Sequence, residues 1–180
     1  MVYLFLADGF EEIEGLTVVD LLRRAEIKIT MVSVTGNLKI AGSHNIKVEA
    51  DGLFEDYDYK DAELLVLPGG MPGTKNLGAH KELVELLKKF RTEDKALAAI
   101  CAAPSVLGEN GLLQGKKVTC FPGFEEKLIG AKATGARAVT DGNIITGKGM
   151  GTAIEFSLEI IRFLANNETA ERIGKTIQYF

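Results

Sequence analysis

The 180-residue sequence is poor in the features that mark several large classes of protein. It contains two cysteines and two histidines, too few for a disulfide framework and without the spacing of zinc ligands. Acidic residues (25) outnumber basic residues (21), and no cluster of lysine or arginine is dense enough to follow a phosphate backbone. No apolar run approaches the roughly 20 residues that cross a bilayer. We therefore expect no metal centre, no binding of nucleic acid and no membrane span.

The composition is that of an ordinary globular protein. Hydrophobic residues make up 46% of the chain and charged residues 26%, and the length suits one domain over residues 1–180. No internal repeat, low-complexity segment or linker divides the sequence. The opening stretch MVYLFLADGFEE turns acidic before a signal-peptide cleavage pattern develops, so we expect a cytoplasmic protein.

Short apolar runs alternate with longer amphipathic segments along the chain. This alternation predicts an α/β fold in which a mainly parallel sheet is covered by helices on both faces. Strands are predicted at residues 2–6, 28–34, 63–67, 95–100 and 116–121, and helices at residues 11–25, 80–90, 103–113 and 151–166. Hairpins are predicted at residues 36–51, attached to the sheet edge, and at residues 137–146.

Three loops each follow a predicted strand, with the sequences ADGFEEIE, PGGMPG and CAAP. In open α/β sheets, ligands bind outside the carboxyl ends of the strands, where helix N-termini present unpaired amide groups. We therefore expect these loops to converge on one site.

Cys101 lies between a predicted strand and a helix that Pro104 is expected to open. The amide end of that helix is expected to stabilise a thiolate and to lower the pKa of the cysteine. The alternative is a buried and inert cysteine, which is the usual reading of a lone cysteine. The position favours a reactive thiol at Cys101, whereas Cys120, without a helix start after it, is interpreted as a core residue.

The glycines after Pro68 and the glutamates after the first strand are the other candidates. Gly69 and Gly70 allow close backbone approach and can direct amides at an oxyanion, although a tight turn alone would also explain them. Glu11, Glu12 and Glu14 all suit the start of a helix, where negative charge is favoured. A carboxyl group of Glu14 that reached the thiolate would be expected to hold a proton and donate a hydrogen bond to it.

The stretches ADGFEEIE, LLVLPGG, AAICAAP and GKGMGTAIEF, in this order and spacing, resemble the ThiJ/PfpI superfamily, in the DJ-1 branch with its YajL-like bacterial members. The resemblance covers nearly the whole chain. It implies a flavodoxin-like α/β three-layer sandwich, a homodimer, and a nucleophilic cysteine that is easily oxidised. It implies no cofactor.

By motif position, the resemblance implies that Cys101 is the nucleophile and Glu14 its protonated acidic partner. It implies that the amides of Gly70 and Ala102 bind an oxyanion. The remaining expected neighbours of the site are Gly69, Phe121, Gly149 and Met150.

The sequence departs from the pattern of related proteins at three places. Phe121 stands where many members of the branch have a histidine, so no general-base role is carried over to this position. Ala102 stands where protease-like members have a histidine, and the absence of a Cys-His pair argues against a peptidase. His44 stands in a stretch where an arginine is common, and we interpret it as a surface loop residue that a dimer could bring to the partner's site.

Three functions are compatible with these residues. The first is glyoxalase or deglycase chemistry on a small dicarbonyl, such as methylglyoxal, or on a glycated thiol or amine, with Cys101 as nucleophile and Glu14 moving a proton. The second is an oxidative-stress sensor or redox-dependent chaperone that works through oxidation of Cys101. The third is a binding module that has kept only the fold.

Overall fold

The computed structural model describes all 180 residues. The strands are β1 (Val2–Leu6), β2 (Ile29–Ser33), β3 (Lys39–Ala41), β4 (Lys47–Glu49), β5 (Gly52–Leu53), β6 (Leu64–Leu67), β7 (Ala96–Ile100), β8 (Lys117–Val118), β9 (Lys132–Ala133), β10 (Ala138–Asp141) and β11 (Ile144–Gly147). The helices are α1 (Glu12–Arg24), α2 (Gly73–Ala79), α3 (Lys81–Thr92), α4 (Pro104–Glu109), α5 (Ala153–Leu164) and α6 (Asn167–Thr176). None of these helices combines the length and the apolar character needed to cross a bilayer.

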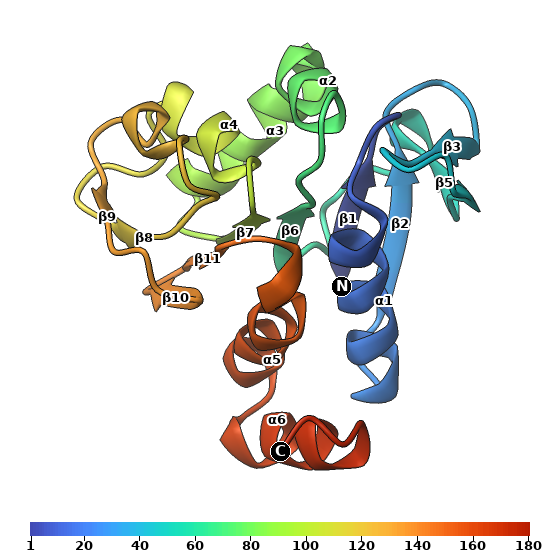
Figure 1. Cartoon of the computed structure of the whole chain (residues 1–180). Helices are drawn as coiled ribbons and strands as arrows, with labels where there is room; N and C mark the ends of the chain where they lie inside the picture. Colours follow the sequence, from blue (N-terminus) through green and yellow to red (C-terminus); the bar gives the residue numbers. More distant parts are fainter.

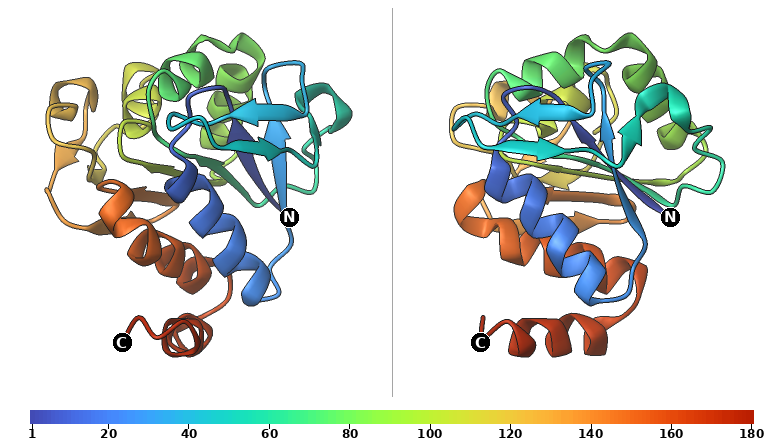
Figure 2. Two further views of the ribbon diagram at one scale, coloured as in Figure 1. Left: turned by 45° about the vertical axis from the view of Figure 1, so that its right-hand side comes forward. Right: turned by 90° about the vertical axis from the view of Figure 1, so that its right-hand side faces the viewer.

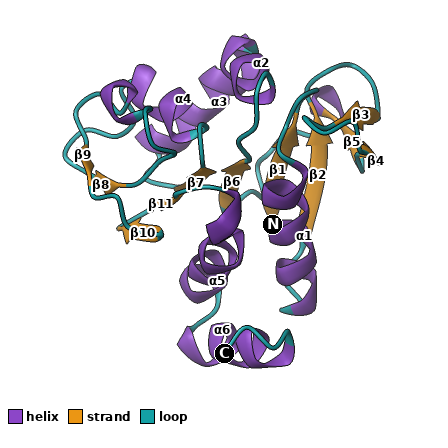
Figure 3. Cartoon of the chain, viewed as in Figure 1, coloured by secondary structure: helices purple, strands orange, loops and turns teal.

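A central sheet of seven strands has the order β10-β11-β7-β6-β1-β2-β5. Every neighbouring pair in it is parallel except β10 and β11, which form the hairpin predicted from the sequence. Helices α2, α3 and α4 cover one face, and α1, α5 and α6 lie on the other (Figures 1, 2 and 3). This is the flavodoxin-like α/β sandwich expected from the sequence.

The strands of the sheet centre are apolar throughout because both of their faces are covered. Along β1, Val2 and Leu4 pack in the core with α1 and α5, whereas Tyr3 and Phe5 pack in the core on the opposite face. All five residues of β1 are buried. The amphipathic segments form the expected helices because each buries its apolar side. The longest apolar stretch of the C-terminal region becomes α5, which packs on α1.

One predicted hairpin and one predicted strand are placed differently by the structure. The hairpin of residues 36–51 forms, but β3 and β4 pair only with each other, and the two-residue strand β5 takes the edge of the main sheet. The predicted strand 116–121 shortens to β8, which pairs with β9 outside the main sheet. The reason is that β11 already occupies the place beside β7 in the main sheet. The segment 117–121 contacts β11 instead, where the Thr119 N–H donates to Thr146 Oγ1 at 2.9 Å.

Two helices were not predicted. The segment of α2 contains two glycines, which weaken a helical pattern. The start of α6 is set by a cap, because the Asn166 side chain accepts a hydrogen bond from the Thr169 N–H.

The order of the strands places several loops together at the carboxyl edge of the sheet. From β1 the chain crosses to β2 on one side of β1, whereas β6 and β7 lie on its other side. The loops after β1 and β6 therefore start at neighbouring strand ends and lead off in opposite directions. They are bonded to each other, since the Glu11 N–H donates to the Gly69 carbonyl at 2.9 Å. The loops after β7 and β11 end at the same edge, which brings Cys101 beside them.

Candidate active site

Cys101 occupies the turn between β7 and α4 with a φ of +64°, in the left-handed region that residues with a Cβ rarely adopt. Its N–H donates to the Gly147 carbonyl at 2.9 Å, and its own carbonyl accepts from the Phe121 N–H at 2.8 Å. These bonds hold a conformation that costs about 1–2 kcal/mol. The result is a cysteine turned out of the strand direction, half-buried and reachable at the edge of the sheet.

Glu14, in the first turns of α1, is completely buried next to this cysteine. Its Oε2 accepts a hydrogen bond from the Gly69 N–H at 2.9 Å. Its Oε1 has no hydrogen-bond partner, and the thiol of Cys101 is the neighbouring side chain that acts most on the pKa of the carboxyl group. The structure thus brings the two expected partners together.

The pKa of Glu14 agrees with the sequence expectation of a carboxyl group that holds a proton, whereas the pKa of Cys101 does not agree with the expected lowering. Burial raises the pKa of Glu14 to about 7, against the opposing effect of its hydrogen bonds with Cys101 and Gly69. Burial and then the neighbouring Glu14 raise the pKa of Cys101 to about 12, although the Ala102 and Gly70 amides act to lower it. The expected lowering of the thiol pKa is therefore wrong for a thiol that faces an ionised Glu14. No cation lies in the pair's surroundings to offset the second negative charge.

The two glycines are required by the space around this pair. A Cβ on Gly69 would lie 2.6 Å from the Cβ of Cys101 and 2.6 Å from Glu14 Oε2. Gly70 has a φ of +88°, and a Cβ there would lie 2.2 Å from the Glu11 nitrogen. Glycine at these positions lets the loop after β6 pass between α1 and Cys101, and it places the Gly70 amide at the sulfur.

A cavity of about 210 Å³ opens over the thiol. It is lined by Gly70, Met71, Cys101, Ala102, Phe121 and Phe124. A second hollow adjoins it on the far side of Phe121, and Gly149 and Met150 line that hollow. A Cβ on Gly149 would lie 3.9 Å from the Cys101 sulfur, so Gly149 borders the thiol, whereas Met150 stands further out.

The structure therefore gathers Cys101, Glu14, Gly69, Gly70, Ala102 and Phe121 around one point. Sequence reasoning missed Met71 and Phe124 as walls of the cavity. The available signal was that Met71 directly follows the PGG stretch and that Phe124 follows the CFPG stretch, but this signal does not tell which way a side chain points. Cys120 is buried in the core, and burial raises its pKa to about 11.

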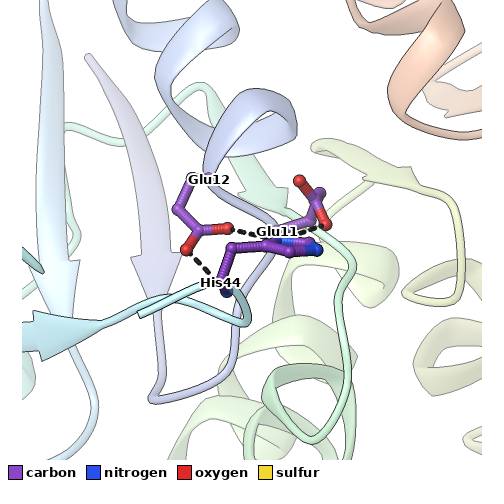
Figure 4. A group of neighbouring side chains, drawn as sticks. All are labelled: Glu11, Glu12 and His44. Carbon is purple, nitrogen blue, oxygen red and sulfur yellow. Dashed lines mark hydrogen bonds and ion pairs between the residues drawn. The ribbon is translucent and has the colours of Figure 1, made fainter. Parts of the chain in front are cut away.

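His44 lies away from this cavity, at the tip of the β3–β4 hairpin, and contacts the start of α1 (Figure 4). Its Nδ1 lies 3.1 Å from Glu12 Oε2 and 3.5 Å from Glu11 Oε2. Hydrogen bonds with Glu12, and then the charge of Glu11, raise the pKa of His44. Burial alone would raise the pKa of Glu12, but hydrogen bonds, including those from the His44 and Ile46 backbone, lower it to about 2. The contact ties the hairpin to the helix that carries Glu14.

The ligand atoms of Glu11, Glu12 and His44 all lie within 4.8 Å of one another, close enough to share a cation. The oxygens of Glu12 are already occupied, however. Oε1 accepts from the backbone N–H groups of His44 and Ile46, and Oε2 is paired with Ser43 and the His44 ring. The chain satisfies this cluster with its own donors.

Comparison with known proteins gives consistent matches. The sequence model of the DJ-1/PfpI family matches residues 1–163. The chain is 36% identical over 171 residues to "Protein DJ-1 homolog B" of Arabidopsis thaliana, covering 94% of this chain but 39% of that longer protein. It is 34% identical over 172 residues to "Protein dj-1beta" of Drosophila melanogaster, covering 94% and 92% of the two chains. Among solved structures, "Toxoplasma gondii DJ-1, oxidized" superposes with a TM-score of 0.94 at 33% identity, covering 98% of this chain and 97% of that chain.

The burial of Glu14 predicts an unusual effect on stability. Because its pKa is raised from 4.5 to about 7, the protonated carboxyl stabilises the fold at low pH, and this contribution is lost as the pH rises through about 7. Glu14→Gln should therefore raise the free energy of unfolding at pH 8.5 by up to roughly 3 kcal/mol, and the gain should shrink below pH 5. Urea denaturation at both pH values measures this.

The exposed Glu126 provides the matched control, since Glu126→Gln should leave the free energy of unfolding unchanged at both pH values. A Glu14→Gln protein that is equally destabilised at pH 5 and pH 8.5 would show that Glu14 is ionised throughout this range.

Proposed function

The chain belongs to the DJ-1/PfpI family, and on that premise we propose that it uses Cys101 as a nucleophile against reactive carbonyl compounds. The substrates are small dicarbonyls, such as methylglyoxal, or their adducts with thiols and amines. The single observation that supports this most is the contact between a half-exposed thiol and the buried Glu14 carboxyl, whose pKa of about 7 suits a group that takes up and returns a proton near neutral pH.

The first step forms a carbon–sulfur bond. The ionised Glu14 takes the proton of the Cys101 thiol while the sulfur attacks the aldehyde carbon, and the π electron pair of the carbonyl moves to its oxygen. The amides of Gly70 and Ala102, which already point at the sulfur, lie where they can stabilise that oxyanion. Glu14 then returns the proton to the oxygen, which gives a hemithioacetal.

The second step moves hydrogen within the bound substrate. A base removes the proton from the former aldehyde carbon while the neighbouring ketone oxygen gains a proton, which gives an enediol. A second proton is then delivered to the former ketone carbon while the hydroxyl group on the sulfur-bearing carbon loses its proton, which leaves a thioester of a 2-hydroxy acid on Cys101. Glu14 is the carboxyl group at hand for these transfers. Water hydrolyses the thioester, so that methylglyoxal and one water give lactic acid and the free thiol, with no external oxidant or reductant. With an adduct, the carbon–nitrogen or carbon–sulfur bond first breaks, and the amine or thiol leaves with a proton.

Peptidase chemistry is not proposed, because neither histidine lines the Cys101 cavity. His44 pairs with Glu12, and His80 caps α3 by accepting a hydrogen bond from the Leu83 N–H at 3.1 Å. Ala102, which follows Cys101 directly and lines the same cavity, offers no imidazole for a Cys-His pair.

Lactate formation from methylglyoxal tests this proposal. The wild type should form lactate at a rate that rises with pH through about 7, because Glu14 must be ionised to accept the thiol proton. Cys101→Ser should abolish the activity, and Glu14→Gln should lower kcat by at least about 100-fold. Cys120→Ala is the control that keeps the activity. A wild type that forms no more lactate than Cys101→Ser would overturn the proposal.

A redox function is the second candidate, and two observations favour it. The Cys101 thiol is reachable while the Glu14 carboxyl beside it can donate a hydrogen bond to an oxidised sulfur. A similar solved structure is described as "oxidized". In this candidate, one peroxide converts the thiolate to a sulfenate and water, a second gives the sulfinate and water, and the change alters a binding surface.

Intact mass measurement after mild peroxide treatment tests the redox candidate. We expect the gain of two oxygens on Cys101 and none on the buried Cys120. Glu14→Gln should slow or stop the second oxidation, because the amide is a weaker donor than the carboxyl group. An unmodified Cys101 would exclude this candidate, and if lactate formation is also absent, a binding module remains.

We also propose a homodimer, with the contact on the exposed face of α1. A hollow of about 720 Å³ there is lined by α1, Ile46, Ile154 and residues 176–178. Ile13 is 50% exposed and Ile46 is 54% exposed, so a second copy would bury apolar side chains that the single chain leaves in water.

The free thiols suit a reducing compartment, and we propose that the protein works in the cytoplasm.

Sedimentation measures the oligomeric state directly. Ile13→Asp and Ile46→Asp should shift the protein from dimer to monomer. Ile129→Asp is the control, because Ile129 is also 54% exposed but lies outside the hollow. A wild type that sediments as a monomer at all concentrations would contradict the dimer.

A further inference from the structure

Three large apolar side chains are exposed around the Cys101 thiol. Met71 is 42% exposed, Phe121 is 48% exposed and Met150 is 49% exposed. Met71 and Phe121 line the cavity over the sulfur, and Phe121 and Met150 line the adjoining hollow. Single exposed apolar residues are common, but a group of them gathered around one nucleophile marks a surface that contacts a ligand. Methionine and phenylalanine together form an adaptable apolar wall.

The same cavity offers no charge to a ligand. Apart from the thiol, none of its lining residues ionises. Lys148 lies in the adjoining hollow, behind Phe121, where its ammonium group donates to the Gly135 carbonyl at 3.2 Å. The ammonium group of Lys127 lies 5.8 Å from the centre of the Phe124 ring, and neither lysine lines the cavity. A substrate that carries a carboxylate next to its reacting carbon would thus lose hydrating water on binding without gaining a cation as partner. Its negative charge would also lie close to Glu14. Charged electrophiles are therefore disfavoured at the sulfur.

The position of Phe121 is fixed by its backbone. Its N–H donates to the Cys101 carbonyl at 2.8 Å, and its own carbonyl accepts from the Phe124 N–H at 3.1 Å. The turn of Cys101 and the ring of Phe121 are thus held in one arrangement. Both lie beside Gly149, where an added Cβ would be 3.3 Å from the ring and 3.9 Å from the sulfur. Because Gly149 has no side chain, this residue covers neither the ring of Phe121 nor the sulfur.

We infer that Phe121 is a specificity-determining residue, which makes Cys101 select uncharged electrophiles that carry a planar apolar substituent beside the reacting carbon. For its natural substrates, the inference rests on the proposed carbonyl chemistry. The substrate class is then the 2-oxoaldehydes, with aryl compounds preferred over alkyl compounds, rather than the 2-oxoacids. The ring of Phe121 stacks on the substituent while the Gly70 and Ala102 amides bind the oxygen.

Alkylation of the thiol tests the inference without any turnover. The second-order rates of Cys101 with iodoacetamide, N-benzyl iodoacetamide and iodoacetate are each divided by the rate of the same reagent with N-acetylcysteine, on protein in which Cys120 is replaced by alanine. We expect the benzyl reagent to be favoured over iodoacetamide by about tenfold and iodoacetate to be disfavoured by about tenfold.

Phe121→Ala should remove the benzyl preference, taken as the ratio of the two normalised rates within the same variant, and Phe121→Leu should keep only part of it. Phe163→Ala is the matched control, because Phe163 is 41% exposed on α5, outside the cavity. Equal normalised rates for the benzyl reagent and iodoacetamide, or a benzyl preference that survives Phe121→Ala, would overturn the inference.

Measurements of turnover distinguish a failure of this inference from a failure of the proposed function. We expect kcat/KM to be higher for phenylglyoxal than for methylglyoxal, to be lowest for glyoxylate, and to fall for phenylglyoxal in Phe121→Ala mainly through KM. If no 2-oxoaldehyde is converted but the benzyl preference depends on Phe121, the carbonyl chemistry fails and the selective cavity stands. If methylglyoxal is converted without any preference for the aryl compound, the chemistry stands and the role of Phe121 fails.

Discussion

The contact between the Glu14 carboxyl, the Gly69 amide and the Cys101 thiol is the constraint on which the site depends. It joins three segments that are far apart in the sequence, and it exists because β1, β6 and β7 lie side by side and end at one edge of the sheet. Gly69 has no side chain because the thiol and the carboxyl group fill that space. The backbone turn at Cys101 and the burial of Glu14 then follow as parts of one arrangement.

The absence of a cation beside this pair sets its chemistry. A cysteine paired with an imidazolium can remain an anion, because the neighbouring charge compensates it. Here the partner is itself an acid, so only one negative charge is readily held between the two groups. In the proposed chemistry the pair works by exchanging a proton, and backbone amides provide the remaining stabilisation. An uncharged substrate suits such a site, since it adds no further charge to a cavity walled by apolar side chains.

Much of the fold could be predicted because its signals are local. The apolar runs of β1, β6 and β7 and the amphipathic pattern of α5 place the sheet and its helices, and the loop motifs at their ends indicate the site. The conformation of Cys101 could not be predicted, since a left-handed cysteine depends on bonds to Gly147 and Phe121 from distant segments. The direction of the thiol pKa was also missed, because helix position suggests a lowering whereas burial and Glu14 dominate. The shortening of the 116–121 strand depends on β11, which takes the place beside β7.

At Cys101, the left-handed backbone favours a different residue from the one that the thiol chemistry requires. Glycine adopts this conformation without strain, and asparagine adopts it more readily than most residues, so either would suit the backbone at this position better than cysteine does. Neither offers a sulfur. A search of variants for thermal resistance alone would thus favour replacement of Cys101 and the loss of its thiol.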